Sequence, residues 1–93
     1  MAARFTLGRV VATPGALEAL KASGVSPIRL LERHQCGDWG EVPPEDAKEN
    51  ERSVKRGFRI ISSNAAGDAG EERIWILTEA DRSSTCILLP DEY

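Results

Sequence analysis

His34, the one histidine of the chain, is the first side chain that could carry out acid–base chemistry. Imidazole changes charge near neutral pH, so histidine is the usual general base of enzymes. With Arg82 as a clamp for phosphate charge and Thr85 or Asn50 as the orienting group, it would form a metal-independent ribonuclease site. His34 also lies where a helix is expected to end, and there it would bond a carbonyl or face solvent. The sequence leaves both interpretations open.

The loop at 78–85 holds a second group of chemically capable side chains, Glu79, Asp81 and Arg82. Two carboxylates at this spacing resemble an acid pair, but a spacing of two residues in a loop is a weak signal. An ion pair between Asp81 and Arg82 that shapes the turn is the simpler interpretation. Exposed pairs of this kind contribute only about 0–1 kcal/mol.

Residues 37–40, Gly-Asp-Trp-Gly, form the third candidate. Two glycines around Asp38 and Trp39 indicate a sharp turn whose indole is anchored in the protein body. Asn50 falls in the middle of the buried face of the next helix, and a buried amide needs hydrogen-bond partners. We expect it to tie that helix to the 37–40 turn, with contact to a ligand as the alternative. Whether the 37–40 and 78–85 blocks are a functional site or determine the fold stays open here.

Cofactor and metal chemistry find little support in the sequence. Cys36 and Cys86 are expected to be free thiols of a reducing cytosol. Cys36 and His34 alone do not complete a tetrahedral zinc site, so no metal is expected. The chain has no glycine-rich phosphate loop, Gly-x-Ser-x-Gly, His-Glu-x-x-His or Cys-x-x-Cys motif, and no cofactor is expected.

The elements that must position these side chains follow from helix-capping residues and β-prone runs. Three helices are expected to begin at Pro14, Pro27 and Glu45 and to end at Gly24, Gly37 and Gly57. Residues 5–11 could form a short edge strand or an extended arm. β-Prone runs predict strands at 58–63, 74–78 and 85–89, with a loop at 64–70 after the first. Together they predict one α+β domain over 1–93, in which about three helices pack on one face of a three- to four-stranded antiparallel sheet.

Composition and charge narrow the classes of protein. The 93 residues are 41% hydrophobic and 29% charged, as in soluble globular domains. No apolar run approaches the roughly 18 residues of a membrane span, and the start lacks a secretory signal, so a cytoplasmic location without membrane contact is expected. Residues 1–35 hold five basic and two acidic side chains, whereas 36–93 hold seven and thirteen. With a net charge of −3, this distribution argues against an extended face for duplex DNA.

Several sequence blocks together resemble a family of small uncharacterised proteins carried on bacterial plasmids and integrative elements. The blocks that carry the resemblance span nearly the whole chain: Arg33-His34, 37–42, Asp46, Asn50, 57–62, 74–82, Thr85, 87–90 and Glu92-Tyr93. The sequence departs from the family pattern at Asn64, where an aromatic residue is expected, which would end that strand earlier. Relatives are often labelled plasmid-related, or as subunit M of a type I restriction enzyme. The second label does not fit 93 residues, which cannot hold the cofactor-binding sheet of a methyltransferase.

The resemblance brings no established activity. Because the sequence shows no complete catalytic constellation and a mixed surface, we expect an accessory or interaction protein of bacterial mobile genetic elements, without enzymatic activity and with an unidentified protein partner. A more distant similarity is to the barnase–EndoU–colicin–RelE class of ribonucleases, in which helices precede a four-stranded antiparallel sheet. The matching positions are Arg33-His34 and Arg82 with Thr85. That similarity implies the alternative, an endoribonuclease that uses His34 and Arg82 on RNA.

Overall fold

The computed structural model describes residues 3–66 and 72–93 of the chain and has the α+β architecture that the sequence predicts. Three helices, four strands and a short 3₁₀ helix, η1, follow one another along the chain. Their order is β1 (Arg9–Ala12), α1 (Pro14–Ser23), α2 (Pro27–Gln35), α3 (Pro44–Arg56), β2 (Ile60–Ala66), β3 (Glu72–Thr78), β4 (Ser84–Leu88) and η1 (Pro90–Glu92).

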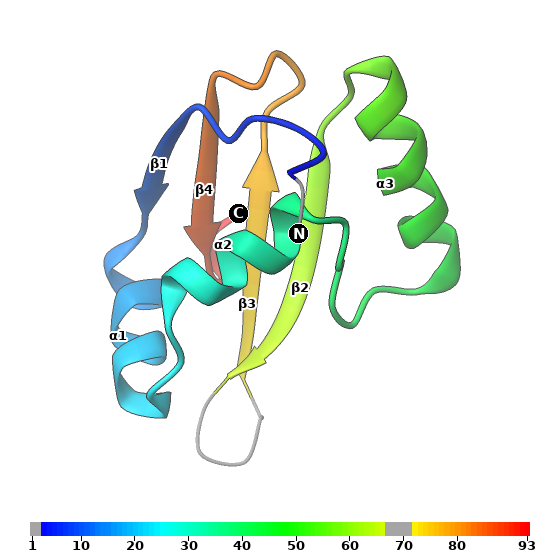
Figure 1. Cartoon of the computed structure of the whole chain (residues 1–93). Helices are drawn as coiled ribbons and strands as arrows, with labels where there is room; N and C mark the ends of the chain where they lie inside the picture. The colour runs from blue at the N-terminus through cyan, green and yellow to red at the C-terminus, as the bar shows by residue number, and fades with distance from the viewer. Residues whose placement is uncertain (1–2, 67–71) are drawn as a thin grey trace.

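The four strands form one sheet in the order β1-β4-β3-β2 (Figure 1). Strands β2, β3 and β4 form the expected antiparallel meander, with Ile60 opposite Thr78 and Thr78 opposite Thr85. Strand β1 pairs with β4 in parallel, Val11 lying beside Cys86. The sequence left an edge strand or an extended arm open in this region and gave no pairing direction, because the two paired segments lie at opposite ends of the chain.

Strand β2 continues further than the sequence indicated. Asn64, Ala65 and Ala66 were expected in a loop, yet they pair with Ile74, Arg73 and Glu72 of β3. The backbone ladder with β3 therefore overrides the low strand preference of alanine and asparagine. The rest of the predicted loop, 67–70, lies outside the described residues.

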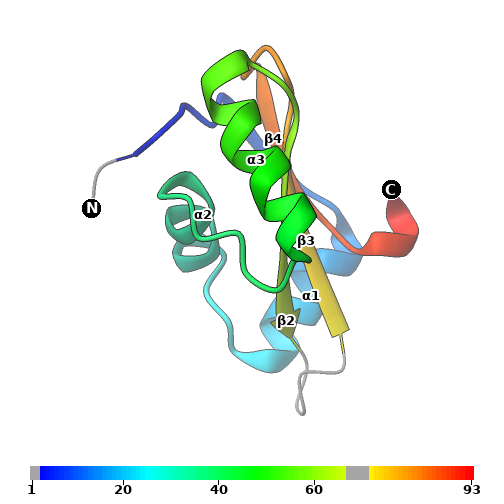
Figure 2. The same ribbon diagram turned by 90° about the vertical axis from the view of Figure 1, so that its right-hand side faces the viewer.

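The helices are distributed over the sheet unequally. Helices α1 and α2 lie over one face, whereas α3 runs beside β2 at the edge (Figures 1 and 2). Alternation along the strands sends one set of side chains toward α1 and α2. These side chains and the inner faces of the two helices form the main core: Ala16, Ala19, Leu20, Leu30, Ala66, Ile74, Ile76 and Ile87.

The opposite face of the sheet carries Trp75, Leu77, Cys86 and Leu88, as the registers between β3 and β4 require. The C-terminal end of the chain lies on this side, away from α2 (Figure 2). Tyr93 there contacts Trp75 edge-on, with ring centroids 5.8 Å apart.

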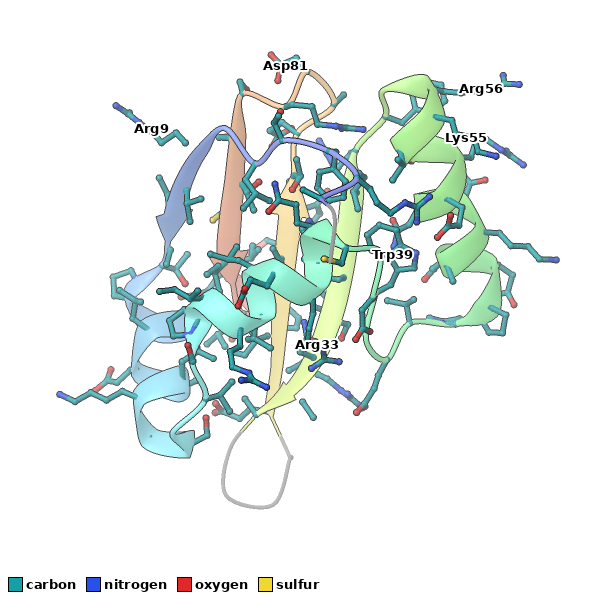
Figure 3. All side chains as sticks on the ribbon, in the orientation of Figure 1. Arg9, Arg33, Trp39, Lys55, Arg56 and Asp81 are labelled. Atoms are coloured by element: carbon teal, nitrogen blue, oxygen red, sulfur yellow. The ribbon has the colours of Figure 1, made fainter. Side chains whose placement is uncertain are left out.

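Local capping explains where the helices begin and end. The Thr13 hydroxyl accepts a hydrogen bond from Ala16 N–H at the start of α1. Gly24 and Gly57 adopt the left-handed conformation after α1 and α3, with φ of 71° and 77°. Lys55 and Arg56 extend from the last turn of α3 into solvent, where cations favour the helix dipole (Figure 3).

No helix within the described ranges is both long and apolar enough to traverse a bilayer.

Gly40 and Gly24 offer a matched pair of substitutions, because both have φ of 71°. A Cβ at Gly24 would meet no atom within 4 Å, whereas a Cβ at Gly40 would overlap the carbonyl oxygen of Ser63. We expect Gly24→Ala to cost about 1 kcal/mol of backbone strain. Gly40→Ala should cost about 2 kcal/mol more, because the 39–41 segment must move away from β2.

Urea denaturation of both variants measures this difference in the free energy of unfolding. Equal destabilisation by the two substitutions would show that the close approach of Gly40 to β2 does not stabilise the fold.

Candidate functional site

His34 is fully buried at the end of α2 and stands in a chain of hydrogen bonds between side chains. Its Nδ1 lies 2.7 Å from the Ser62 hydroxyl, and its Nε2 lies 2.9 Å from the Thr78 hydroxyl. Thr78 is 2.8 Å from the hydroxyl of Thr85, which donates to the carbonyl oxygen of Leu7 at 2.8 Å. The chain therefore links α2, all three strands of the meander and the N-terminal segment.

The direction of this chain determines the tautomer of His34. The Leu7 carbonyl can only accept, so Thr85 uses its single proton there. Thr78 must then donate to Thr85 and accept from Nε2–H of His34. Nδ1 is left as an acceptor for the Ser62 hydroxyl. Both ring nitrogens are thus occupied within the protein.

Aromatic rings surround the remaining sides of the imidazole. Phe5 and Trp39 both contact it edge-on, with centroid distances of 5.3 and 6.0 Å. Burial, and to a smaller extent the positive charge of Arg82, lower the pKa of His34 to about 4. The ring is therefore neutral at neutral pH and inaccessible to a substrate.

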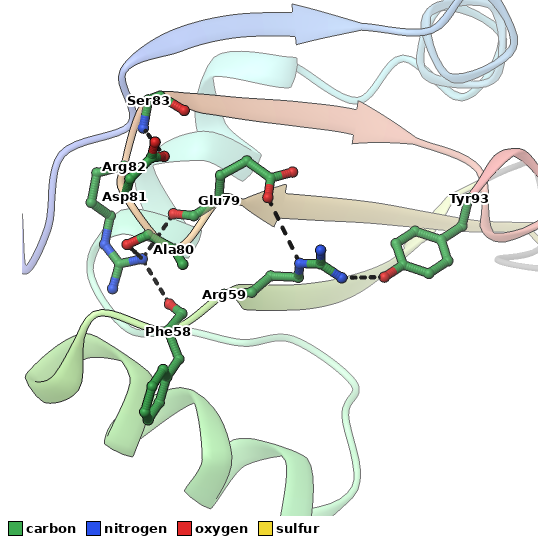
Figure 4. Close-up of polar contacts among 8 residues, drawn as sticks. All are labelled: Phe58, Arg59, Glu79, Ala80, Asp81, Arg82, Ser83 and Tyr93. Carbon is green, nitrogen blue, oxygen red and sulfur yellow. Dashed lines mark hydrogen bonds and ion pairs between the residues drawn. The ribbon is translucent and has the colours of Figure 1, made fainter.

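The guanidinium of Arg82 donates its hydrogen bonds to backbone carbonyl groups. Nη1 donates to the carbonyl oxygens of Phe58, Glu79 and Ala80 (Figure 4). Nη2 donates to the carbonyl oxygen of Ser53. The group also lies 5.5 Å from the centre of the Phe5 ring. It thereby joins the end of α3, the start of β2 and the β3–β4 loop.

The expected ion pair between Asp81 and Arg82 was wrong. Asp81 instead accepts the backbone N–H of Ser83 at 3.0 Å. Hydrogen bonds from the Ser83 side chain and then from its backbone lower the pKa of the Asp81 carboxyl. A short polar side chain that bonds the backbone two residues on is a local turn device, so it leaves Arg82 free to reach distant carbonyls. The carboxylate of Glu79 lies 3.8 Å from Nε of Arg59 (Figure 4). Nη1 of the same arginine donates to the Tyr93 hydroxyl.

The expected tie between Asn50 and the 37–40 turn was also wrong. The side-chain amide of Asn50 donates to the Ile61 carbonyl at 2.8 Å and accepts the Ile61 N–H at 3.2 Å. It thus occupies both outward-facing backbone groups of one residue on the edge strand β2. The partner differs because α3 runs alongside β2, which brings the middle of the helix to the strand rather than to the turn.

The 37–40 turn is held by its own contacts. Asp38 pairs with Arg33 at 2.8 Å and accepts the N–H of Gly40 at 3.1 Å, and the bond from Arg33 is the main cause of its lowered pKa. Trp39 is buried between α2 and α3 (Figure 3) and donates to Glu51 at 3.1 Å.

The structure brings His34 and Thr85 together through Thr78, but not into a cleft open to solvent. Asn50 bonds the edge of β2 instead of joining them, and Arg82 faces carbonyl groups. Sequence reasoning missed Ser62 and Thr78 as partners of the histidine. A signal was present: both hydroxyls sit at strand positions whose neighbours two residues away, Ile60 and Ile76, are inward-facing and apolar.

A groove of about 400 Å³ lies between α3, the 41–43 segment, β2 and β3, on the sheet face that carries Trp75. Its apolar lining comes from Val42, Pro43, Ile61 and Trp75. Its charged rim holds three carboxylates and one guanidinium, from Glu41, Asp46, Glu49 and Arg59. Sequence reasoning named Asp46 only as part of a resemblance, since the groove depends on where α3 docks.

In the described part of the chain, no three histidine, cysteine or acidic side chains come close enough together to hold a metal ion. Cys36 and Cys86 are both free and partly buried. Burial raises the pKa of the Cys86 thiol, with the charges of Glu92 and Glu79 acting in the same direction.

No protein-family model, no curated protein and no solved structure matches this chain. The geometry of its own residues is therefore the basis for the function proposed below.

The buried state of His34 predicts an acid-sensitive fold. The unfolded chain protonates His34 near its ordinary pKa of 6.5, whereas the folded chain does so only near about 4. Acidification through this window favours the unfolded state, so the free energy of unfolding should fall by up to about 3 kcal/mol between pH 6.5 and 4. Above pH 6.5 this contribution is complete.

Because the chain has one histidine, ¹⁵N-NMR reports His34 without ambiguity. We expect an Nε2–H tautomer that does not titrate until about pH 4. Denaturation of His34→Gln should retain only the slope that carboxylates cause. A ring that titrates near pH 6.5 in the folded protein would contradict the buried hydrogen-bond chain.

Arg82 has the one positive φ, 61°, among the non-glycine residues that the structure describes. Arg82→Ala keeps that strained backbone and removes the guanidinium, and we expect a loss of about 2–3 kcal/mol. Arg82→Gly removes the same group but relieves the strain, so it should cost about 1 kcal/mol less than alanine. Chemical denaturation measures both, and a neutral Arg82→Ala substitution would show that the carbonyl contacts do not stabilise the fold.

Proposed function

We propose that this protein is a non-enzymatic interaction module, and that the groove beside α3 binds an extended, basic segment of a partner protein. The observation that carries the proposal is the composition of this groove: a floor with Ile61 and Trp75 under a rim with three carboxylates and one guanidinium. An apolar lining with a few placed polar or charged groups is the usual arrangement of a ligand-binding site.

The charges of the rim favour a cationic ligand. Glu41 is paired with Arg73, Glu49 with Arg52, and Arg59 with Glu79. In the described part of the chain no cation pairs with Asp46, which stands in the first turn of α3. A lysine or arginine side chain of the partner would form an ion pair with Asp46. Its methylene groups would pack on the indole of Trp75, or its cationic group would make a cation–π contact with that ring.

The resemblance to proteins of bacterial plasmids and integrative elements supports the setting of this proposal. In that setting the chain is a cytoplasmic accessory protein of a mobile genetic element, and its partner is another protein. The resemblance contributes no catalytic residues that would conflict with a binding role.

The ribonuclease alternative lacks comparable support. His34 is neutral and buried with both nitrogens bonded, and Arg82 is turned toward four carbonyl oxygens. Neither group is placed to contact the phosphate of an RNA. Cleavage of mixed RNA that His34→Ala abolishes without unfolding the protein would reverse the order of the two functions.

A peptide selection tests the groove directly. We expect the protein to enrich extended peptides with lysine or arginine from a random phage-displayed library. Asp46→Lys with Glu49→Lys, both exposed, should weaken an enriched synthetic peptide at least about tenfold, which is about 1.4 kcal/mol, in fluorescence anisotropy.

Glu18→Lys with Asp91→Lys is the matched control, since it makes the same change in net charge at exposed positions outside the groove. It should leave the affinity almost unchanged. Equal weakening by both pairs, or a selection without basic peptides, would overturn the proposed binding site.

A further inference from the structure

The outward-facing backbone groups of the two sheet edges differ in whether they have hydrogen-bond partners. On β2, the outward backbone groups of Ile61 are bonded by the Asn50 amide. Ser63 donates its N–H to the Trp39 carbonyl at 3.1 Å and accepts the N–H of Glu41 at 2.7 Å. From Ile61 to Ser63 this edge is therefore covered by the chain itself, as edges of stable monomeric sheets usually are.

The β1 edge has no such cover among the residues that the structure describes. Arg9 N–H bonds the Ser83 carbonyl and Thr13 N–H bonds that of Ile87, so the odd-numbered residues face β4. Val10 and Ala12 then direct their N–H and C=O groups outward, because these groups alternate along a strand. No strand lies beyond β1 in the sheet, and Val10 and Val11 are each 44% exposed.

We propose that the β1 edge is a self-association surface, on which a second copy of this chain adds its own β1 in antiparallel orientation about a two-fold axis at Val11. The inference goes beyond the groove and does not rest on it. Since β1 and β2 are opposite edges of the sheet, the pairing would leave a groove free in each copy (Figure 1).

The register follows from two constraints on antiparallel pairs. Residues directly opposite each other share a face, and the outward backbone groups must meet one another. Val10 therefore bonds Ala12 of the second copy, Val11 meets Val11, and Arg9 stands opposite Thr13. An exposed pair of valines lies at the centre of the interface.

Charge complementarity favours a second copy over an unrelated strand. Thr13 donates to the carboxylate of Glu92 at 2.6 Å, and this bond and the N–H of Leu89 lower the pKa of Glu92. Arg9 of one copy would thus meet the ionised Glu92 held at Thr13 of the other. The two-fold axis makes this pair twice.

Arg9 extends away from the body of the protein in the single chain (Figure 3), and no carboxylate pairs with it in the described ranges. Its own Glu92 is bound to Thr13, which lies four residues along the extended chain, about 13 Å away. Arg9 and Val11 share the sheet face of Cys86. The C-terminal end of the chain, to which Glu92 belongs, also lies on this side of the sheet (Figure 2).

Sedimentation equilibrium over a range of concentrations tests the association. We expect a reversible dimer, whose dissociation constant rises about tenfold or more in Val10→Pro, because the proline removes two symmetry-related hydrogen bonds. Val10 N–H is not used within the monomer, so this variant should keep its fold, which circular dichroism checks. Wild-type protein that remains monomeric at millimolar concentration would overturn the proposal.

A charge exchange tests the partner. Arg9→Glu alone should weaken the dimer, and Arg9→Glu with Glu92→Arg should restore part of the loss. Restoration supports contact between copies, since the two positions are too far apart within one chain. No change with Arg9→Glu would remove the charge argument for a second copy and overturn the pairing.

Cross-linking tests the register. In a Cys36→Ser, Cys86→Ser background, oxidation of Val11→Cys should give a covalent dimer, because position 11 meets itself on the axis. Val10→Cys is the matched control and should cross-link much more slowly, since position 10 faces Ala12. Preferential cross-linking through position 10 would overturn this register.

Discussion

A buried imidazole with both nitrogens bonded to hydroxyl groups is the interaction on which the rest of this structure depends. His34 joins α2 to Ser62 of β2 and Thr78 of β3, and through Thr85 to β4 and the N-terminal segment. A buried polar group that lost its partners would cost about 1–3 kcal/mol. These hydrogen bonds therefore specify one position of α2 over the sheet. The fold is held in place by polar contacts as well as by its aliphatic core.

Arg82 and Asn50 extend the same principle to the margins of the sheet. Each satisfies backbone groups of segments distant in the sequence, Arg82 at the end of α3 and Asn50 at the edge of β2. These three side chains are the ones whose types most suggested catalysis. Because the fold uses their hydrogen-bonding groups, the contacts that we propose with other molecules lie on the outer surface, at the groove beside α3 and at the β1 edge.

The two sheet edges explain how one small domain can offer distinct surfaces. The β2 edge is closed by Asn50 and the 39–41 segment, which also forms a wall of the groove. The β1 edge keeps outward backbone groups and two exposed valines. Pairing at one edge and peptide binding near the other would be geometrically independent.

The sequence alone determined the features that rest on local chemistry. Thr13, Gly24 and Gly57 set the limits of helices, and the β-prone residues of 74–78 and 85–89 predicted the central strands, because capping and strand preference act within a few residues. Only the tertiary structure decided the parallel pairing of β1 with β4, the burial of His34 and the carbonyl contacts of Arg82. Their partners lie far away in the sequence, 28 and 44 positions for His34, and which of them meet depends on how the helices dock.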